Sequence, residues 1–368
     1  MRRKIIWTLL ALVLLPAAFA GWLILNARAM PVVRRAEVVL PFPADAPRRA
    51  MTVALLTDTH LSGPDNSPAR MARIVAQINA LKPDLILLGG DYIGDAKGGA
   101  TYDARASIAS FAGLRAPLGV VAVLGNHDSR SQKNQRALSG TDWQAAFTRM
   151  GITLLQDRAV RRGPLAIGGL QDIYTRKIDL PATLAAMTRL GGAPVILSHG
   201  PDVFPTLPDA PSLTLVGHTH CGQVALPFAG IVYVPTKYGT RYACGLYRDG
   251  TKTMIVAGGV GTSGLPIRML AAGYLADHHP DELSRLLTSY HDMISIYHHA
   301  FPGRYPRRRR QMARSAGARA GQVARGGVAG GGAGLPRGNG VRDQQEMARY
   351  RLWRMERECR YWRRGRVA

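Results

Sequence analysis

Five short segments carry carboxylate, amide and imidazole side chains in an order that could hold divalent metal ions. They are Asp58-Thr59-His60, Gly90-Asp91, Gly125-Asn126-His127-Asp128, Ser198-His199 and Gly217-His218-Thr219-His220. Oxygen and imidazole ligands without a required thiolate suit Mn²⁺, Fe or Zn²⁺ better than Ca²⁺ or a structural zinc. Residues two apart in an extended segment project to the same side, so Asp58 with His60, and His218 with His220, can each offer two ligands to one locus. The pattern therefore predicts metal-dependent chemistry.

Single segments also have structural explanations. Asp58 could cap a helix, and His199 could be a histidine satisfied within the core. Cys221, next to the last segment, could coordinate a metal or pack as a small buried side chain. The number and order of the segments favour the catalytic interpretation, because Gly-Asn-His-Asp and Gly-His-Thr-His are each specific and both follow Asp-x-His and Gly-Asp.

Short apolar runs alternate with helical stretches, and each ligand segment lies at the end of a predicted strand or in the loop after it. The periodicity predicts strands over Thr52–Thr57, Leu85–Leu88 and Val120–Leu124, with a helix over Pro68–Leu81. The second half is richer in predicted strands, at Leu165–Leu170, Val195–Leu197, Leu213–Val216, Ile231–Val234 and Met254–Ala257. We therefore expect an α/β fold in which two mixed β-sheets pack together and are flanked by helices.

These motifs resemble those of the calcineurin-like metallophosphoesterases, in particular their membrane-associated bacterial branch. The resemblance runs from about Met51 to Arg268 and ends with Gly-Thr-Ser-Gly-Leu-Pro-Ile-Arg. It implies the phosphoesterase sandwich fold and two divalent metal ions as cofactors, Mn, Fe or Zn. By this resemblance the first metal is held by Asp58, His60 and His220, the second by Asn126, His199 and His218, and both by Asp91. The resemblance also makes His127 the catalytic acid, oriented by Asp128.

Two metal ions explain why so many ligands would be needed. Two cations roughly 3.5–4 Å apart can generate a bridging hydroxide and neutralise charge on an in-line phosphoryl transition state. A protonated His127 could then stabilise the leaving oxygen or give it a proton, which is typically worth about 10²- to 10⁴-fold in rate. The prediction is a binuclear metallophosphoesterase that hydrolyses phosphoester, phosphodiester or pyrophosphate bonds without a covalent phosphoenzyme.

The N-terminus carries a membrane signal. Ile5 to Leu25 is 21 residues without a charge, preceded by Arg2, Arg3 and Lys4. About 20 apolar residues span a bilayer, and the basic cluster favours a cytoplasmic N-terminus. We therefore expect a signal anchor over residues 1–25, a single pass through the cytoplasmic (inner) membrane, and an exported catalytic domain. The alternative is a signal peptide cleaved after Ala18-Phe19-Ala20.

The remaining boundaries follow from composition. Residues 26–50 form a Pro- and Arg-rich spacer, and residues 51–268 form the metallophosphoesterase domain. From Phe301 to Ala368 there are 18 Arg, no Lys and four acidic residues, so this part supplies 18 − 4 = +14 of the net charge of +24. Residues 269–368 therefore form a divergent Arg-rich tail, predicted to be disordered. It could be a real extension, solvated or attracted to anionic lipid, or the product of a shifted reading frame.

Three functions from different classes fit the sequence. The first is an envelope hydrolase that acts on a phosphorylated lipid, a small molecule, or a lipid-linked nucleotide such as a UDP-2,3-diacylglucosamine. The second is a nuclease with the same chemistry, which export away from nucleic acid disfavours. The third is a non-enzymatic, membrane-bound polyanion-binding protein, which the complete ligand set disfavours. The three cysteines lie far apart without CxxC spacing, which leaves the redox compartment open.

Overall fold

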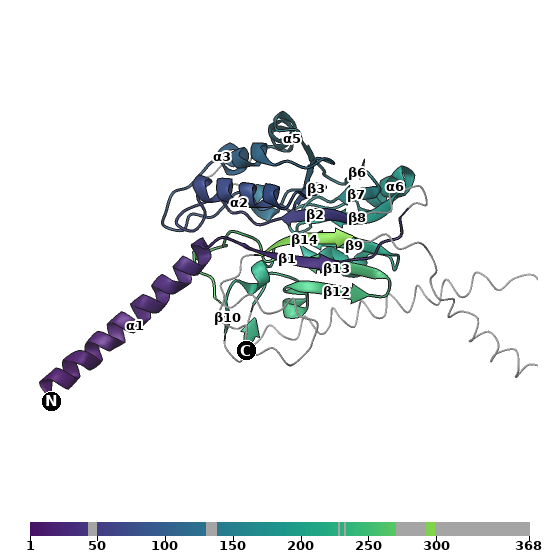
Figure 1. The fold of residues 1–368 in the computed structure, drawn as a ribbon. Helices are drawn as coiled ribbons and strands as arrows, with labels where there is room; N and C mark the ends of the chain where they lie inside the picture. The colour runs from purple at the N-terminus through teal and green to yellow at the C-terminus, as the bar shows by residue number, and fades with distance from the viewer. Residues whose placement is uncertain (43–49, 130–137, 227–228, 232, 270–291, 299–368) are drawn as a thin grey trace, which may run out of the picture. The chain divides into compact units, whose positions relative to one another are not determined.

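A computed structural model describes residues 1–42, 50–129, 138–226, 229–231, 233–269 and 292–298 (Figure 1). Two six-stranded sheets form its centre. The first has, in spatial order, β1 (Val32–Glu37), β14 (Asp292–His298), β2 (Met51–Leu56), β3 (Leu85–Leu88), β4 (Val120–Ala122) and β5 (Ile152–Leu154). The second has β12 (Gly245–Asp249), β13 (Lys252–Val256), β9 (Ser212–Val216), β8 (Ala193–Leu197), β7 (Leu165–Gly169) and β6 (Arg158–Arg162). A short hairpin pairs β10 (Ala225–Leu226) with β11 (Gly230–Ile231).

Strand direction brings the ligand segments to one edge. Strands β2 to β5 run parallel, as do β7, β8, β9 and β13. In the second sheet the outer pairs β12 with β13 and β6 with β7 are antiparallel, and in the first sheet β14 is antiparallel to β2, so both sheets are mixed. Loops that follow parallel strands emerge at the same edge of a sheet. The loops after β2, β3, β4, β8 and β9 therefore come together at the carboxyl edge.

Helices cover the outer faces of the two sheets. On the first sheet lie α2 (Pro68–Ala80), α3 (Ala104–Ala109) and α5 (Gly140–Arg149), which Figure 1 shows on one side of the strands. On the second sheet lies α6 (Leu180–Leu190). A separate apolar layer fills the space between the sheets, where Leu55, Leu87 and Leu215 are fully buried. The structure thus has the predicted architecture of packed mixed sheets flanked by helices.

Helix starts follow from the sequence. Helix α2 begins with Pro at its first position, and the side chain of Ser67 accepts a hydrogen bond from the backbone N–H of Arg70. Asp103, Ser139 and Asp179 cap α3, α5 and α6 in the same way. Such caps satisfy N–H groups that have no partner within the helix, which fixes where each helix begins. These caps make the helix boundaries predictable.

The ends of the chain differ from the predicted boundaries. Helix α1 (Arg2–Arg28) is long and apolar enough to cross a membrane, with a mean hydropathy of 2.3 over 18 residues. Strand β1 lies inside the predicted spacer, and β14 lies beyond Arg268, yet both pair within the first sheet. The domain limits predicted at Met51 and Arg268 leave these two strands out. The rest of the predicted disordered tail, residues 270–291 and 299–368, lies outside the described residues.

Candidate metal centre

The structure brings the predicted ligands together at the carboxyl edge of the strands. Asp58 and His60 follow β2, Asp91 follows β3, Asn126 and His127 begin the helical turn α4 (Asn126–Ser129) after β4, His199 follows β8, and His218 and His220 follow β9. Their side-chain atoms form overlapping groups. Within 4.8 Å of one another lie ligand atoms of Asp58, His60 and His220, of His60, Asp91 and His127, and of Asp91, His199 and His218.

Unusual backbone angles turn these side chains inward. Five of the residues have a positive φ: Asp58 at 51°, His60 at 37°, Asp91 at 57°, His218 at 70° and His220 at 51°. Residues with a side chain adopt this left-handed region at a cost, and it is concentrated at functional sites. The same residue that ends a strand can therefore direct its side chain toward the cluster.

Two glycines give the carboxylates room. A Cβ atom on Gly217 would collide with Asp58 Oδ2, and one on Gly125 would collide with Asp91 Oδ1. Both glycines precede ligand residues in the motifs. Their role here is close approach of the backbone to a buried carboxylate, which any larger residue would prevent.

Backbone carbonyls fix the orientation of three imidazole rings. A carbonyl oxygen accepts a hydrogen bond, so the ring nitrogen facing it carries hydrogen and the other nitrogen offers its lone pair to the cluster. The three contacts are His60 Nδ1 to Ile93 at 3.0 Å, His199 Nδ1 to Gly89 at 2.9 Å and His218 Nε2 to Pro235 at 2.9 Å. His60 and His218, when neutral, thus have the orientation expected of histidines that bind a metal, and His199 has the same orientation.

The inward-facing atoms form a donor set for cations. His60 Nε2 lies 3.1 Å from His220 Nε2, and His199 Nε2 lies 3.1 Å from the amide oxygen of Asn126. One oxygen of Asp91, Oδ2, lies 3.4 Å from His60 Nε2 and 3.2 Å from His199 Nε2. Imidazole nitrogens, an amide oxygen and carboxylates packed this closely are the ligands that divalent transition metals use.

Burial keeps His60 and His218 neutral, whereas His199 pairs as a cation with Asp91. Burial, together with a neighbouring histidine, lowers the pKa of His60 and of His218 to about 3, so both are neutral at physiological pH. Burial alone would raise the pKa of Asp91, but the imidazoles of His199 and His127 lower it well below its usual range. Burial would likewise lower the pKa of His199, but Asp91 outweighs it and raises the value to about 10. The anionic Asp91 therefore sits at the centre of the cluster.

Comparison with known proteins agrees with this geometry. Residues 51–222 match the model of the calcineurin-like phosphoesterase family. Over 207 residues the chain is 34% identical to the uncharacterized metallophosphoesterase YkuE of Bacillus subtilis strain 168, and the alignment covers 54% of this chain and 68% of YkuE. The chain belongs to the calcineurin-like phosphoesterase family. It is a metal-dependent hydrolase, and its His and Asp groups form a site for a pair of divalent cations.

Two further relatives carry more specific names. The chain is 31% identical over 191 residues to phosphodiesterase YaeI of Escherichia coli K12, covering 49% of this chain and 64% of YaeI. It is 27% identical over 224 residues to the UDP-2,3-diacylglucosamine pyrophosphatase LpxG of Chlamydia muridarum, covering 48% of this chain and 66% of LpxG. Similarity to these phosphoesterases thus covers about half of the chain.

In this metallophosphoesterase Asp128 does not take the position predicted for it. Its two carboxylate oxygens are occupied by four backbone N–H groups, which hold the Asp91 loop against the start of α4. The donors are Asp91 at 2.8 Å and Gly125 at 2.9 Å to Oδ2, and Tyr92 at 2.8 Å and Ile93 at 3.2 Å to Oδ1. The prediction that Asp128 orients the imidazole of His127 therefore needs correction.

The carboxylate beside the imidazole of His127 belongs to Asp95, which the sequence analysis missed. Asp95 Oδ1 lies 3.3 Å from His127 Nδ1. Burial lowers the pKa of His127, but Asp91 and Asp95 outweigh it and raise the pKa to about 9. His127 therefore carries a proton at neutral pH, as a general acid must. The sequence does show an acidic residue four positions after Asp91. Its spacing within a loop, however, does not reveal that its side chain contacts His127.

The glycine-rich loop from Gly258 to Arg268, whose end carries part of the family resemblance but no predicted role at the site, packs directly on the ligands. The backbone N–H of Gly261 donates to the carbonyl of Asp58 at 2.8 Å. A buried ion pair anchors this loop, since Lys97 Nζ lies 2.8 Å from Asp65 Oδ1 and donates to the carbonyl of Thr262 at 2.7 Å. The hydroxyl of Thr262 donates to Asp65 Oδ2 at 2.9 Å. This stretch is therefore part of the wall of the metal centre.

A disulfide bond joins Cys221 to Cys244. From the sequence, Cys221 is expected to bind a metal or to pack as a small buried side chain, and the three cysteines, far apart and without CxxC spacing, suggest no pairing; the two that pair are 23 residues apart. The bond ties the 3₁₀ turn His220–Gly222, which contains a metal-site histidine, to the segment that leads into β12. The end of the last ligand motif is thus covalently fixed.

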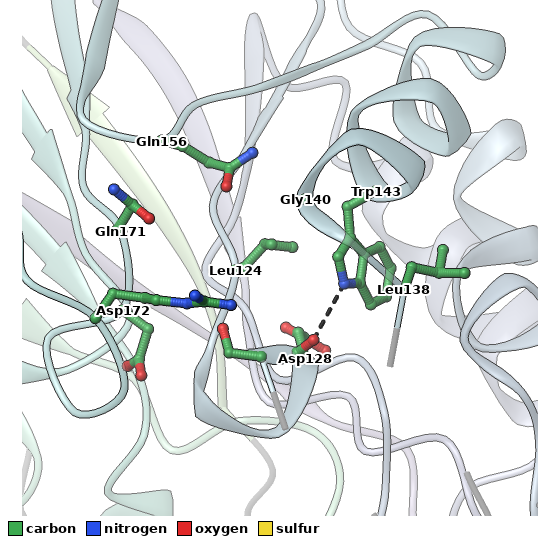
Figure 2. Close-up of a pocket in the computed structure, with 10 residues that line it drawn as sticks. Leu124, Asp128, Leu138, Gly140, Trp143, Gln156, Gln171 and Asp172 are labelled. Atoms are coloured by element: carbon green, nitrogen blue, oxygen red, sulfur yellow. Dashed lines mark hydrogen bonds between the residues drawn. The ribbon is translucent and has the colours of Figure 1, made fainter. Parts of the chain in front are cut away.

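A cavity of about 250 Å³ is lined by Asp128 and by none of the histidines of the candidate metal centre. Figure 2 shows Asp128 at its floor, with the indole N–H of Trp143 donating to the Asp128 carbonyl at 3.1 Å. Gln156 and Gln171 face it from the opposite wall. Asp128 is the shared element, since it lines this cavity and also holds the Asp91 loop.

Proposed function

We propose that this metallophosphoesterase hydrolyses a phosphodiester or pyrophosphate bond of a lipid or lipid-linked nucleotide at a membrane surface. The observation that carries the assignment is the position of Asp91, whose Oδ2 is within 3.4 Å of His60 Nε2 and 3.2 Å of His199 Nε2. One carboxylate oxygen that reaches both histidine groups suits a ligand shared by two cations. The proposed ligands are Asp58, His60 and His220 for one cation, Asn126, His199 and His218 for the other, and Asp91 for both.

When bound, two divalent cations activate water and neutralise charge on the phosphoryl oxygens. The chain's own residues supply the rest of the chemistry. His127 begins α4 and keeps 15% of its side chain exposed, so its Nε2–H can reach the leaving oxygen of a substrate at the edge of the cluster. Asp95 holds the opposite ring nitrogen, so the proton moves from His127 Nε2 to the leaving oxygen. Such acid catalysis contributes about 10²- to 10⁴-fold.

Two observations support a membrane-anchored, exported domain. Helix α1 is long and apolar enough to span a bilayer and follows Arg2, Arg3 and Lys4, a basic flank that favours a cytoplasmic N-terminus. The disulfide between Cys221 and Cys244 favours an oxidising compartment, because cytosolic thiols are kept reduced. We therefore place the catalytic domain on the exported side of the cytoplasmic membrane.

The substrate class rests on this anchoring and on the relatives. LpxG is by name a pyrophosphatase of a nucleotide-linked diacyl sugar, and YaeI is by name a phosphodiesterase. A site held at a membrane meets phosphorylated lipids at a high local concentration. A lipid or lipid-linked nucleotide is therefore the substrate class that we propose.

The test uses the full chain in detergent micelles, stripped with EDTA and reloaded with Mn²⁺. Hydrolysis of bis-p-nitrophenyl phosphate is measured beside Asp91→Asn, His127→Gln and a control, Asp249→Asn, whose side chain is 63% exposed. We expect activity that needs the metal, is lost in Asp91→Asn, falls about 10²- to 10⁴-fold in His127→Gln and is unchanged in the control. A folded parent chain that binds no metal would refute the assignment. Strongly salt-dependent DNA cleavage would favour the nuclease instead.

A further inference from the structure

Exposed apolar side chains gather beside the metal centre. After α1, seven large hydrophobic residues are exposed in the described part of the chain: Met30, Val39, Leu190, Leu226, Tyr233, Tyr238 and Leu265. Four of them belong to two segments, 223–242 and 261–269. Their exposed fractions are 46% for Leu226, 73% for Tyr233, 38% for Tyr238 and 63% for Leu265. We call these four residues the interfacial face. Scattered exposed residues need no explanation, but a cluster marks an interaction site.

The two segments form one continuous part of the molecule. Val224 and Met269 form an isolated parallel bridge. The N–H of Met269 donates to the carbonyl of Gln223 at 3.0 Å, and that of Ala225 donates to the carbonyl of Met269 at 2.9 Å. The Gln223 amide donates to the carbonyl of Leu265 at 2.9 Å. Leu265 and the hairpin that carries Leu226 are therefore held together by hydrogen bonds, and Tyr233 lies two residues after that hairpin.

The same part is bonded to the end of the apolar helix. The N–H of Arg268 donates to the carbonyl of Leu23 at 3.2 Å. Arg70, of which 3% is exposed, donates to the carbonyl of Ala29 at 2.7 Å and to that of Val260 at 2.9 Å. Figure 1 shows that α1 meets the domain at its C-terminal end. The segment that carries Leu265 is therefore bonded to the end of the candidate membrane helix.

The segment that carries Tyr233 and Tyr238 is also hydrogen-bonded to one of the proposed metal ligands. The carbonyl of Pro235, between Tyr233 and Tyr238, accepts the Nε2–H of His218 at 2.9 Å. Two exposed cations, Lys237 and Arg241, lie in the same segment. Tyrosine, leucine and basic side chains together are the composition found at the boundary between headgroups and acyl chains. A bilayer surface matches this apolar and cationic chemistry, and the adjoining helix α1 would bring one to it.

We infer that the interfacial face rests on the bilayer surface that α1 enters and holds the metal centre at the level of the lipid headgroups. The site would then take phosphorylated headgroups from the leaflet next to the domain. The inference thus has two halves, the membrane contact and the substrate. The substrate half rests on the proposed function, whereas the membrane contact does not. Lys237 and Arg241 would add attraction to anionic headgroups.

The contact is tested without catalysis, on the full chain in nanodiscs of phosphatidylcholine and phosphatidylglycerol. Cys359, outside the described residues, is replaced by Ser, and Leu265→Cys carries the dye NBD. The control is Leu190→Cys, since Leu190 is 38% exposed and ends α6 before β8 begins, at the edge opposite the metal centre. Interfacial segments enter about 5–10 Å into the headgroup boundary, so lipids with a nitroxide headgroup should quench NBD at 265 and not at 190. Equal quenching at both positions would overturn the inference.

The substrate half is tested by turnover. Two p-nitrophenyl esters are compared in the same nanodiscs, soluble bis-p-nitrophenyl phosphate and a diacylglycerol p-nitrophenyl phosphodiester embedded in the bilayer. The variant Leu226→Asp with Tyr233→Asp, two exposed residues outside the loop that packs on the ligands, should keep the turnover of the soluble ester and lose that of the embedded one. Unchanged turnover of both esters, or equal loss of both, would overturn this half. If the parent chain hydrolyses neither ester, the proposed function fails, while the quenching result still decides the membrane contact.

Discussion

Substitution of Asp128 by Asn separates the role predicted from sequence from the role seen in the structure. The carboxylate accepts four backbone N–H groups, two at each oxygen. An asparagine keeps one acceptor oxygen and turns an NH₂ group toward two donors. Hydrogen bonds to a charged group are worth about 1.5–3 kcal/mol each, so the loss of two costs about 3–6 kcal/mol. Because domains unfold with only about 5–15 kcal/mol, this change removes a large part of the stability. We expect the melting temperature to fall on the order of 10 °C.

Asp95→Asn is the matched substitution, and its effects should be the reverse. The Asp95 side chain is 24% exposed and faces His127 as a partly solvated pair, so the stability should change by less than about 1 kcal/mol. The catalytic rate should fall, by no more than the roughly 10²- to 10⁴-fold that an acid contributes, because the imidazole loses its orienting acceptor.

The Asp95 variant also has a signature in pH. Asp95 raises the pKa of His127, so its removal lowers that pKa. The protonated imidazole is the active acid, and activity is lost as pH rises through its pKa. The alkaline limb of the rate profile should therefore move to lower pH in Asp95→Asn, while the acid limb stays in place.

These outcomes are measured on the Mn²⁺-loaded full chain, by thermal unfolding and by the pH profile of bis-p-nitrophenyl phosphate hydrolysis. Asp249→Asn serves as the control for loss of one surface carboxylate, since its side chain is 63% exposed. A stable Asp128→Asn protein with reduced turnover, together with an unchanged pH profile for Asp95→Asn, would refute our reasoning. That result would mean that Asp128, and not Asp95, orients the imidazole of His127.

Three further predictions concern stability. Lys97→Met leaves the buried carboxylate of Asp65 without the cation 2.8 Å away, which should cost about 3–5 kcal/mol in urea unfolding; a loss below 1 kcal/mol would contradict the buried pair. Reduction of the bond between Cys221 and Cys244, 23 residues apart, should cost about 2–4 kcal/mol, and an unchanged melting temperature in dithiothreitol would argue against the pairing. Mn²⁺ at 100 times its Kd should stabilise the EDTA-stripped chain by about 2.7 kcal/mol, whereas no shift would mean that the folded site does not bind it.

The sequence by itself determined the local features of this protein. An unbroken apolar run such as Leu85–Leu88 predicts a strand buried on both faces, and the structure has β3 at those residues. The apolar N-terminal helix and the caps of α2 and α6 follow from local patterns as well. The proposed ligands lie together because they follow strand ends in order, and parallel strands bring such positions to one edge.

The tertiary structure decided which loops meet. Asp95 lies beside His127, Cys221 pairs with Cys244, and β14 pairs with both β1 and β2. Each of these contacts joins segments that are separate in sequence, and no periodicity in either segment encodes the partner. A strand or a helix is specified by its own residues, whereas a contact between loops depends on where two sheets place them. For that reason the residues that the structure gathers into the candidate metal centre could be picked out from the sequence, and the residues that orient and enclose them could not.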